Sequence, residues 1–286
     1  MLRQRVITAV ILLIILLAAL LASSPLPLVL LLALIAACAL WEWLRLTSPI
    51  PGPVLPAAVA LAIGLGLAVV ALQWLSVPAA PWTWSFFLMI NQWLLPAVAL
   101  AWLAGGSAMV VRARTDQRRH PLSLSLFAVL AALSAWAALV QLFRVYGAWY
   151  LVSLLATIWI ADIAAYFVGK AWGRNKLAPR VSPGKTIEGA LGGIVGATAW
   201  VIATSFWPGS FGAVLAGRWP LWAVVLIAIF LAALSIVGDL FESLLKRRAG
   251  VKDSSNLLPG HGGVYDRIDA LLPVAPFAFL FSTGLW

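Results

Sequence analysis

The sequence is poor in charged residues, cysteine and histidine. Charged residues make up 10% of the 286 positions, whereas soluble globular domains carry about 25%. The single cysteine, Cys38, excludes an intrachain disulfide and argues against thiol chemistry, and with only two histidines a zinc centre is not expected. A water-soluble fold with a charged surface is therefore excluded.

The chain instead contains long apolar runs, in keeping with its hydrophobic content of 64%. A helix needs roughly 17–25 apolar residues to cross about 30 Å of hydrocarbon. Nine segments have about this length, near 6–22, 27–44, 54–75, 82–104, 123–143, 149–169, 187–207, 220–242 and 269–286. We predict an all-α polytopic membrane protein with about nine transmembrane helices. The first run exceeds the apolar core of a signal peptide, about 7–15 residues, so we expect a retained helix.

Lysine and arginine are distributed unevenly between the loops of this topology. If the N-terminus is cytoplasmic, 17 of the 19 basic residues fall on the cytoplasmic side, and only Arg144 and Arg218 lie on the other. The positive-inside rule therefore predicts a cytoplasmic N-terminus. It also explains most of the basic excess by topology and by contacts with anionic membrane lipids, so no nucleic-acid partner is expected.

Acidic residues mark the half of the chain in which chemistry is expected. Seven of the nine lie between Asp162 and Asp269. Residues 1–120 are accordingly predicted to be a scaffold of helices, and residues 121–286 to combine helices with cytoplasmic catalytic loops. Asp162 is expected about 10 Å inside its helix, where a carboxylate costs at least ~2.5–3.5 kcal/mol and needs a polar cavity, a partner or an ion.

The loop 173–189 is basic and contains candidate phosphate ligands, Ser182 and Lys185, with Glu188 near the start of the next helix. A Gly-Lys-Thr triplet in this loop is similar to the end of a P-loop. Pro179 replaces the first glycine of that motif and no strand precedes it, so a Walker A site is rejected. The alternative interpretation is a loop that only sets topology.

The end of the eighth segment carries polar groups on one helical face. Asp239, Ser243 and Lys246 are spaced i, i+4 and i+7, which aligns a carboxylate, a hydroxyl and an ammonium group. Glu242 is spaced to form an ion pair with Lys246. This face is a candidate for phosphate chemistry at the polar end of the helix.

Two further carboxylates lie at the mouth of the ninth segment. Asp266 and Asp269 are spaced i, i+3 and can converge on one cation near a helix N-terminus. Oxygen ligands of this kind indicate Mg²⁺ or Mn²⁺. Capping of the helix by Asp266 is the alternative, but it does not explain the whole cluster. Glycines on both sides of His261 indicate close approach of the backbone to a ligand.

These residues together carry a family resemblance. The patterns are Ser243-x-x-Lys246-Arg247, Lys252-Asp253, His261-Gly262-Gly263 and Asp266-Arg267-x-Asp269. They resemble the signature of the phosphatidate cytidylyltransferases, also called CDP-diacylglycerol synthases. Upstream, Asp162 and Ser182-Pro-x-Lys185-Thr-x-Glu188-Gly are also similar to that family, whereas residues 1–150 match only in hydropathy. Gly184 and Ile163 depart from the pattern, which affects the detail of phosphate contacts in the loop.

The resemblance implies transfer of the cytidylyl group of CTP to phosphatidate, with Mg²⁺ (or Mn²⁺) as cofactor and CTP as co-substrate. It implies Asp239, Ser243, Lys246, Asp266 and Asp269 as the catalytic residues. The implied metal ligands are Asp239, Asp266 and Asp269, with Asp162 and Glu188 as further candidates. The implied contacts with the nucleotide are Ser182, Lys185, Arg247, Lys252, His261, Gly262, Gly263 and Arg267.

The implied setting is the bacterial inner (plasma) membrane, with the active site facing the cytoplasm. The expected partners are phosphatidate, CTP and membrane lipids, and a homodimer is left open. A CTP-dependent kinase of a lipid alcohol is an alternative function, and it differs in releasing CDP. An ion-coupled transporter that uses Asp162 and Asp239 is a weaker one, since no internal repeat is found. A CDP-alcohol phosphatidyltransferase is disfavoured because its D-G-x-x-A-R motif is missing.

Overall fold

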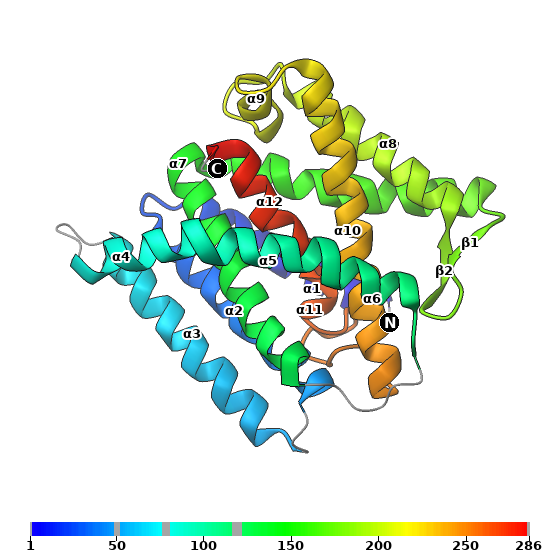
Figure 1. Cartoon of the computed structure of the whole chain (residues 1–286), viewed down its shortest axis with the longest axis horizontal. Coiled ribbons are helices and arrows are strands. Elements are labelled where there is room, and N and C mark those ends of the chain that lie inside the picture. The colour runs from blue at the N-terminus through cyan, green and yellow to red at the C-terminus, as the bar shows by residue number, and fades with distance from the viewer. Residues whose placement is uncertain (1, 49–51, 76–80, 116–121, 285–286) are drawn as a thin grey trace.

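A computed structural model of the chain describes residues 2–48, 52–75, 81–115 and 122–284. Helices form most of the described part (Figure 1). Their bounds are α1 Leu2–Leu20, α2 Leu26–Thr47, α3 Val54–Leu75, α4 Pro81–Met89, α5 Leu95–Ala101, α6 Ser107–Arg112, α7 Leu122–Trp172, α8 Ile187–Thr204, α9 Phe211–Ala216, α10 Leu221–Ala249, α11 Tyr265–Ile268 and α12 Leu271–Thr283. Two π-helical turns, η1 Ile90–Leu94 and η2 Trp102–Gly106, join α4, α5 and α6. The strands β1 Lys176–Ala178 and β2 Ser182–Thr186 form an antiparallel hairpin.

The polytopic helical class is confirmed. Six helices in the described ranges are long and apolar enough to cross a membrane: α2, α3, the continuous helix Pro81–Arg112, α7, α8 and α10. The predicted count of nine is not confirmed. The apolar part of α1, Val6–Leu20, is shorter than a span, and α12 has only 13 residues.

The helix α7 combines the predicted segments 123–143 and 149–169 in one run of 51 residues. Gly147 interrupts this run with φ 84°, a conformation that glycine adopts without steric cost. Gly147 lies in the predicted gap between residues 143 and 149. The two predicted helices are therefore present, but a kink rather than a loop joins them. Asp116, Arg118 and Arg119, which contribute to the charge distribution, lie outside the described residues.

The pair α7 and α8 forms the layer that carries the hairpin at its end (Figure 1). The two helices approach closely because α8 presents glycine to α7. A side chain at Gly193 would meet the carbonyl oxygen of Ala161 and the Cβ atom of Ala165, and one at Gly196 would meet the Cβ atom of Ala164. Small residues permit this kind of close helix packing in membranes.

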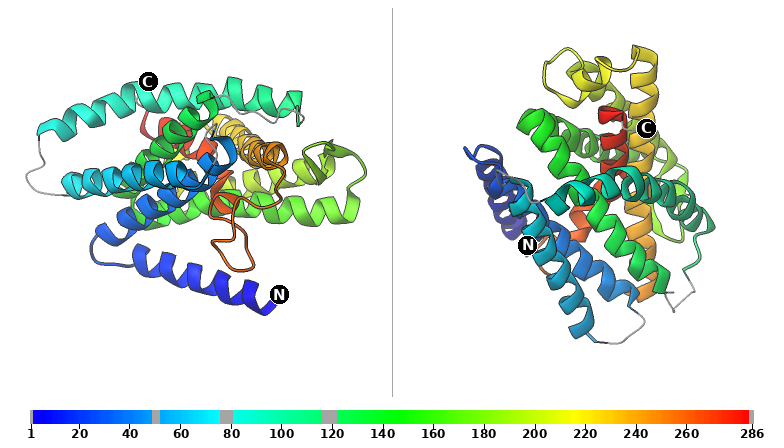
Figure 2. Two further views of the ribbon diagram at one scale, coloured as in Figure 1. Left: turned by 90° about the horizontal axis from the view of Figure 1, so that it is seen from below. Right: turned by 60° about the vertical axis from the view of Figure 1, so that its left-hand side comes forward.

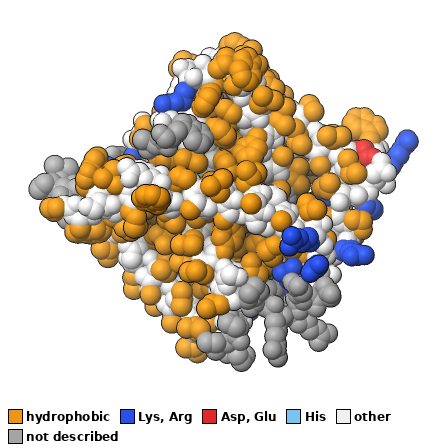
Figure 3. All heavy atoms as spheres, in the orientation of Figure 1, with side chains coloured by type: hydrophobic (Ala, Val, Ile, Leu, Met, Phe, Trp, Pro, Cys, Tyr) orange, Lys and Arg blue, Asp and Glu red, His pale blue; other side chains and the backbone are white. Residues whose placement is uncertain are grey.

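The helix α1 lies at the edge of the molecule and packs mainly on α2 (Figure 2). The loop between α10 and α11 extends toward it, and Thr8 Oγ1 donates a hydrogen bond of 2.8 Å to the carbonyl oxygen of Pro259. The face shown in Figure 3 is largely hydrophobic, with basic side chains gathered where α6 and the hairpin lie. Arg218 precedes α10 at its opposite end and donates to the carbonyl oxygen of Ser282 at 2.7 Å.

Candidate functional site

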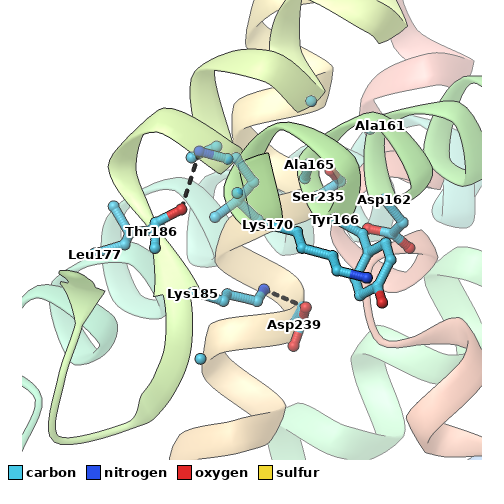
Figure 4. Close-up of a pocket in the computed structure, with 16 residues that line it drawn as sticks. Ala161, Asp162, Ala165, Tyr166, Lys170, Leu177, Lys185, Thr186, Ser235 and Asp239 are labelled. Atoms are coloured by element: carbon cyan, nitrogen blue, oxygen red, sulfur yellow. Dashed lines mark hydrogen bonds and ion pairs between the residues drawn. The ribbon is translucent and has the colours of Figure 1, made fainter. Parts of the chain in front are cut away.

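A cavity of about 460 Å³ opens between the end of α7, the hairpin, the start of α8 and the middle of α10. Asp162, Tyr166 and Lys170 line it from α7, Lys185 comes from β2, and Asp239 comes from α10 (Figure 4). The carboxylate of Asp162 is therefore exposed to a cavity. The sequence analysis predicted that Asp162 needs a polar cavity, a partner or an ion, and the structure places it in a cavity. Tyr166 and Lys170 were not among the predicted site residues.

The hairpin delivers Lys185 to this cavity. Lys176 is paired with Thr186 and Ala178 with Ser182, so the short strands end at the start of α8. Thr186 caps α8 by accepting a hydrogen bond of 3.1 Å from the backbone N–H of Gly189. Lys185, one residue earlier, forms an ion pair with Asp239 across the cavity (Figure 4).

Glu188 lies at the base of the hairpin and does not line the cavity. Its carboxylate accepts hydrogen bonds from the backbone N–H groups of Arg174 at 3.1 Å and Asn175 at 3.2 Å, and from Asn175 Nδ2 at 2.7 Å. These contacts tie the first turn of α8 to the segment that follows α7. The geometry supports Glu188 as an anchor of the hairpin, and Glu188 is not part of the acidic group of three that is found in the described part of the chain.

Three carboxylates converge beside the cavity. Asp239, Glu242 and Asp269 each place an oxygen within 4.8 Å of the others, and Glu242 Oε1 is buried with no hydrogen-bond partner in the described part of the chain. The backbones come this close because Gly238 packs against the Asp269 carbonyl oxygen and Pro273. Clustered acid oxygens with an unpartnered buried atom fit a divalent cation such as Mg²⁺.

Glu242 is thus a candidate ligand that the sequence analysis paired only with Lys246. Its i, i+3 spacing from Asp239 puts both carboxylates on one face of α10, and this was the signal that could have found it. Asp266, which was predicted as a ligand, lies outside the group of three. The four acids nevertheless form one network, because Lys246 joins Glu242 to Asp266.

Lys246 lies between two carboxylates. Its Nζ atom is 2.6 Å from Glu242 Oε2 and 2.6 Å from Asp266 Oδ1. The second oxygen of Asp266 accepts hydrogen bonds from Ser254 N at 3.1 Å, Ser254 Oγ at 2.9 Å and Gly263 N at 2.7 Å. Asp266 therefore fixes both the ammonium group and the loop that follows α10.

The protonation of Asp266 is set by two opposing effects. Burial raises the pKa of its carboxyl group, but the hydrogen bonds from Lys246 and from the Gly263 N–H, together with the positive charge of Lys246, outweigh burial. The net result is a pKa below the usual range for aspartate. Asp266 is therefore an anion at neutral pH and keeps Lys246 in place.

The remaining predicted residues lie around this centre. Ser243 Oγ donates to Asp239 Oδ1 at 3.4 Å, and Arg247 Nε donates to the carbonyl oxygen of Val181 at 3.2 Å, which ties the hairpin turn to α10. Ser182 pairs within the hairpin and Lys252 is exposed in the loop after α10. Neither residue lines the cavity.

The glycines around His261 shape the loop before α11. Arg267 binds the carbonyl oxygen of His261 through Nε at 3.1 Å and also through Nη2. His261 Nδ1 is buried and has no partner among the residues that the structure describes. Gly262 adopts φ 81°, and a side chain there would meet Asp266 Oδ2. The backbone N–H of Gly263 donates to the same oxygen. Both glycines therefore allow the loop backbone to pack closely against the Asp266 carboxylate.

We predict that Asp266→Asn lowers turnover by about 10²-fold, because the amide cannot hold Lys246 as an ion pair. The carboxamide is nearly the same size, so insertion into the membrane and helix content should stay as in the unchanged protein. Turnover and circular dichroism of the purified variant check both statements. Near-normal turnover would remove Asp266 from the site.

The fold and the site together define a class. A helical membrane bundle whose cavity places lysines beside clustered carboxylates is the arrangement of an enzyme that acts on phosphate groups. The family model described as the cytidylyltransferase family matches residues 3–284. The chain belongs to the cytidylyltransferase family, which the signature in residues 243–269 had indicated.

Curated relatives agree with this family. A phosphatidate cytidylyltransferase of Haemophilus influenzae is 33% identical over 295 residues, covering 98% of this chain and 98% of that protein. One of Brucella suis is 38% identical over 205 residues, covering 70% of this chain and 72% of that protein. One of Bacillus subtilis is 46% identical over 136 residues, covering 47% of each.

Proposed function

We propose that this protein transfers the cytidylyl group of CTP to phosphatidate, giving CDP-diacylglycerol and pyrophosphate. The observation that carries the proposal is the convergence of Asp239, Glu242 and Asp269 beside a cavity that also holds Lys185. The family and the names of the relatives support the same reaction. A cavity of about 460 Å³ is within the range of pockets for small molecules, about 300–1,000 Å³.

In this reaction a phosphate oxygen of the lipid attacks the α-phosphorus of CTP, and the bond to the departing pyrophosphate breaks. Both reactants are anionic, so the protein must bring negative charges together and neutralise them. Lys185 and Lys170 line the cavity and would bind phosphate oxygens there. Lys246, fixed between Glu242 and Asp266, would hold its positive charge at the edge of the same site.

Asp239, Glu242 and Asp269 are the residues that would hold Mg²⁺. The ion, when bound, would neutralise triphosphate oxygens and polarise the reacting phosphorus. Asp239 belongs both to the group of three and to the cavity wall, so it would join the ion to the nucleotide. Asp266 acts as the anchor of Lys246 in this proposal. Asp162, which lines the cavity from α7, would be a second carboxylate beside Asp239 in the cavity wall.

The site is proposed to face the cytoplasm from the bacterial inner membrane. The cavity lies beside the hairpin, at the end of the molecule where basic side chains gather (Figure 3). The positive-inside rule assigns such an end to the cytoplasm, where CTP is present. Phosphatidate would approach within the plane of the membrane, because the face of the bundle is largely hydrophobic.

The test is an assay of the purified full chain in detergent micelles with phosphatidate, Mg²⁺ and CTP labelled either at the α- or at the γ-phosphate. Transfer of the α-label to lipid together with pyrophosphate release is the expected result. A CTP-dependent lipid kinase would transfer the γ-label and release CDP. Absence of α-label in the lipid over a full Mg²⁺ titration would overturn the proposal.

A further inference from the structure

One carboxylate of the predicted scaffold lies in contact with the loop before α11. Glu42 is in α2 and has no exposed surface. It accepts hydrogen bonds from Ser254 Oγ at 3.0 Å, Ser255 Oγ at 2.5 Å, Val264 N at 3.0 Å and Tyr265 N at 2.6 Å. All four donors follow it by more than 200 positions in the sequence.

The burial of Glu42 requires these partners. Burying a carboxylate in so apolar a helix is strongly unfavourable unless its oxygens accept hydrogen bonds, and hydrogen bonds to a charged acceptor are about twice as strong as neutral ones. Ser255 Oγ and Val264 N donate to Oε1, and Tyr265 N donates to Oε2, which shares the single hydroxyl proton of Ser254 with Asp266. Trp43, the next residue of α2, stacks on Tyr265 at 5.0 Å between ring centroids and reinforces the same junction.

The loop that Glu42 binds is also the loop that holds Asp266. Ser254 Oγ lies within hydrogen-bond distance of Glu42 Oε2 and of Asp266 Oδ2, and its backbone N–H donates to Asp266 Oδ2. Gly263 donates to Asp266 as well, and a side chain at this glycine would collide with Ser254 Oγ and with the Glu42 carboxylate. A continuous series of contacts therefore leads from Glu42 through residues 254–263 to Asp266.

Lys246 is the end of this series. Its ammonium group contacts Asp266 and Glu242, and Glu242 belongs to the acidic group of three. A shift of the loop would move Asp266, and Lys246 would follow it. Glu42, at the start of the series, does not itself line the cavity.

We propose that Glu42 is a positioning residue of this site, which acts through the loop 254–265 on Asp266 and Lys246. The proposal rests on the proposed cytidylyl transfer for its effect on turnover. The anchoring of the loop is independent of that function. The scaffold half of the chain therefore supplies one residue to the organisation of the centre.

The test compares Glu42→Gln with a matched variant on the same helix, Thr47→Val. Glu42→Gln preserves size, removes the charge and replaces one acceptor oxygen by a donor that faces other donors. Thr47 is also fully buried, and the hydrogen bonds of its hydroxyl go to the carbonyl oxygen of Trp43 and to Ser125, not to the loop. Hydrogen exchange of the full chain in detergent micelles is measured first, without substrates. The kcat and the KM for CTP are measured next.

In Glu42→Gln the amides of residues 254–265 should exchange faster, about tenfold or more, while those of α8 stay unchanged. The kcat should fall by about tenfold or more, with the KM for CTP changed less than about threefold, because Lys185 on the hairpin is not held by Glu42. Thr47→Val should leave both the loop exchange and kcat near the values of the unchanged protein. If Glu42→Gln cannot be purified folded, Ser255→Ala removes one of the four bonds from the loop side and should change the same observables in the same direction.

Unchanged exchange in residues 254–265 overturns the anchoring role. A kcat no lower than that of Thr47→Val overturns the effect on the site. If the unchanged protein forms no lipid-linked product, the proposed function fails, and the exchange comparison still decides whether Glu42 holds the loop.

Discussion

Asp239→Asn is expected to lower turnover by about 10³-fold or more, because loss of a charge that holds a catalytic ion removes most of the electrostatic stabilisation of the transition state. Asp239 is the one acid in the described part of the chain that belongs both to the cavity wall and to the group with Glu242 and Asp269. Asparagine keeps the shape of the side chain but presents a neutral oxygen to any cation. The ion pair with Lys185 is lost as well.

The measurement is pyrophosphate release as a function of Mg²⁺ concentration, with Tyr146→Phe as the control variant. Tyr146 donates to the carbonyl oxygen of Ser282 near Arg218, at the other end of α10 from Lys246. Loss of that bond should leave turnover unchanged. Raised Mg²⁺ should restore part of the activity of Asp239→Asn if the defect lies in ion binding. Activity within a few-fold of the unchanged protein would show that Asp239 does not hold the ion.

Local patterns in the sequence were sufficient for the helices and for part of the site. The length and hydropathy of the apolar runs predicted the helical membrane class, and Gly147 falls in the predicted gap between two of them. The helical spacing of Asp239, Ser243 and Lys246 predicted their common face. These features depend on neighbours within one or two turns, so no knowledge of the tertiary fold was needed.

Glu242 was missed although its spacing from Asp239 is local, whereas the role of Glu42 depends on contacts between distant segments. Nothing near Glu42 identifies its partners, since these lie in a loop that only the packing of α11 on α2 brings to it. Its burial cost was nevertheless a signal, because a lone acid between Trp41 and Trp43 in an apolar run needs donors. Glu188 differs from Glu42 in that the sequence analysis did name it, as a candidate metal ligand. Its carboxylate instead accepts hydrogen bonds from the backbone N–H groups of Arg174 and Asn175.

Lys246→Ala is expected to have two separable effects, on stability and on turnover. Only 14% of the Lys246 side chain is exposed, and its carboxylate partners Glu242 and Asp266 are exposed by 2% and 8%. Removing the ammonium group leaves two acids without their shared cation, and breaking a buried ion pair in this way costs about 3–5 kcal/mol of unfolding free energy. Turnover should fall by about 10³-fold, since a phosphate-neutralising charge is also lost.

A second substitution separates the two effects. In Lys246→Ala with Asp266→Asn, one of the two uncompensated charges is gone, so the thermal stability in micelles should recover by a large part of the loss while turnover stays low. Lys252→Ala, an exposed lysine of the following loop, is the stability control and should melt like the unchanged protein. If the double variant melts no higher than Lys246→Ala, repulsion between the two carboxylates is not the source of the instability. The helix α10 would then depend on Lys246 for packing by its aliphatic part rather than for its charge.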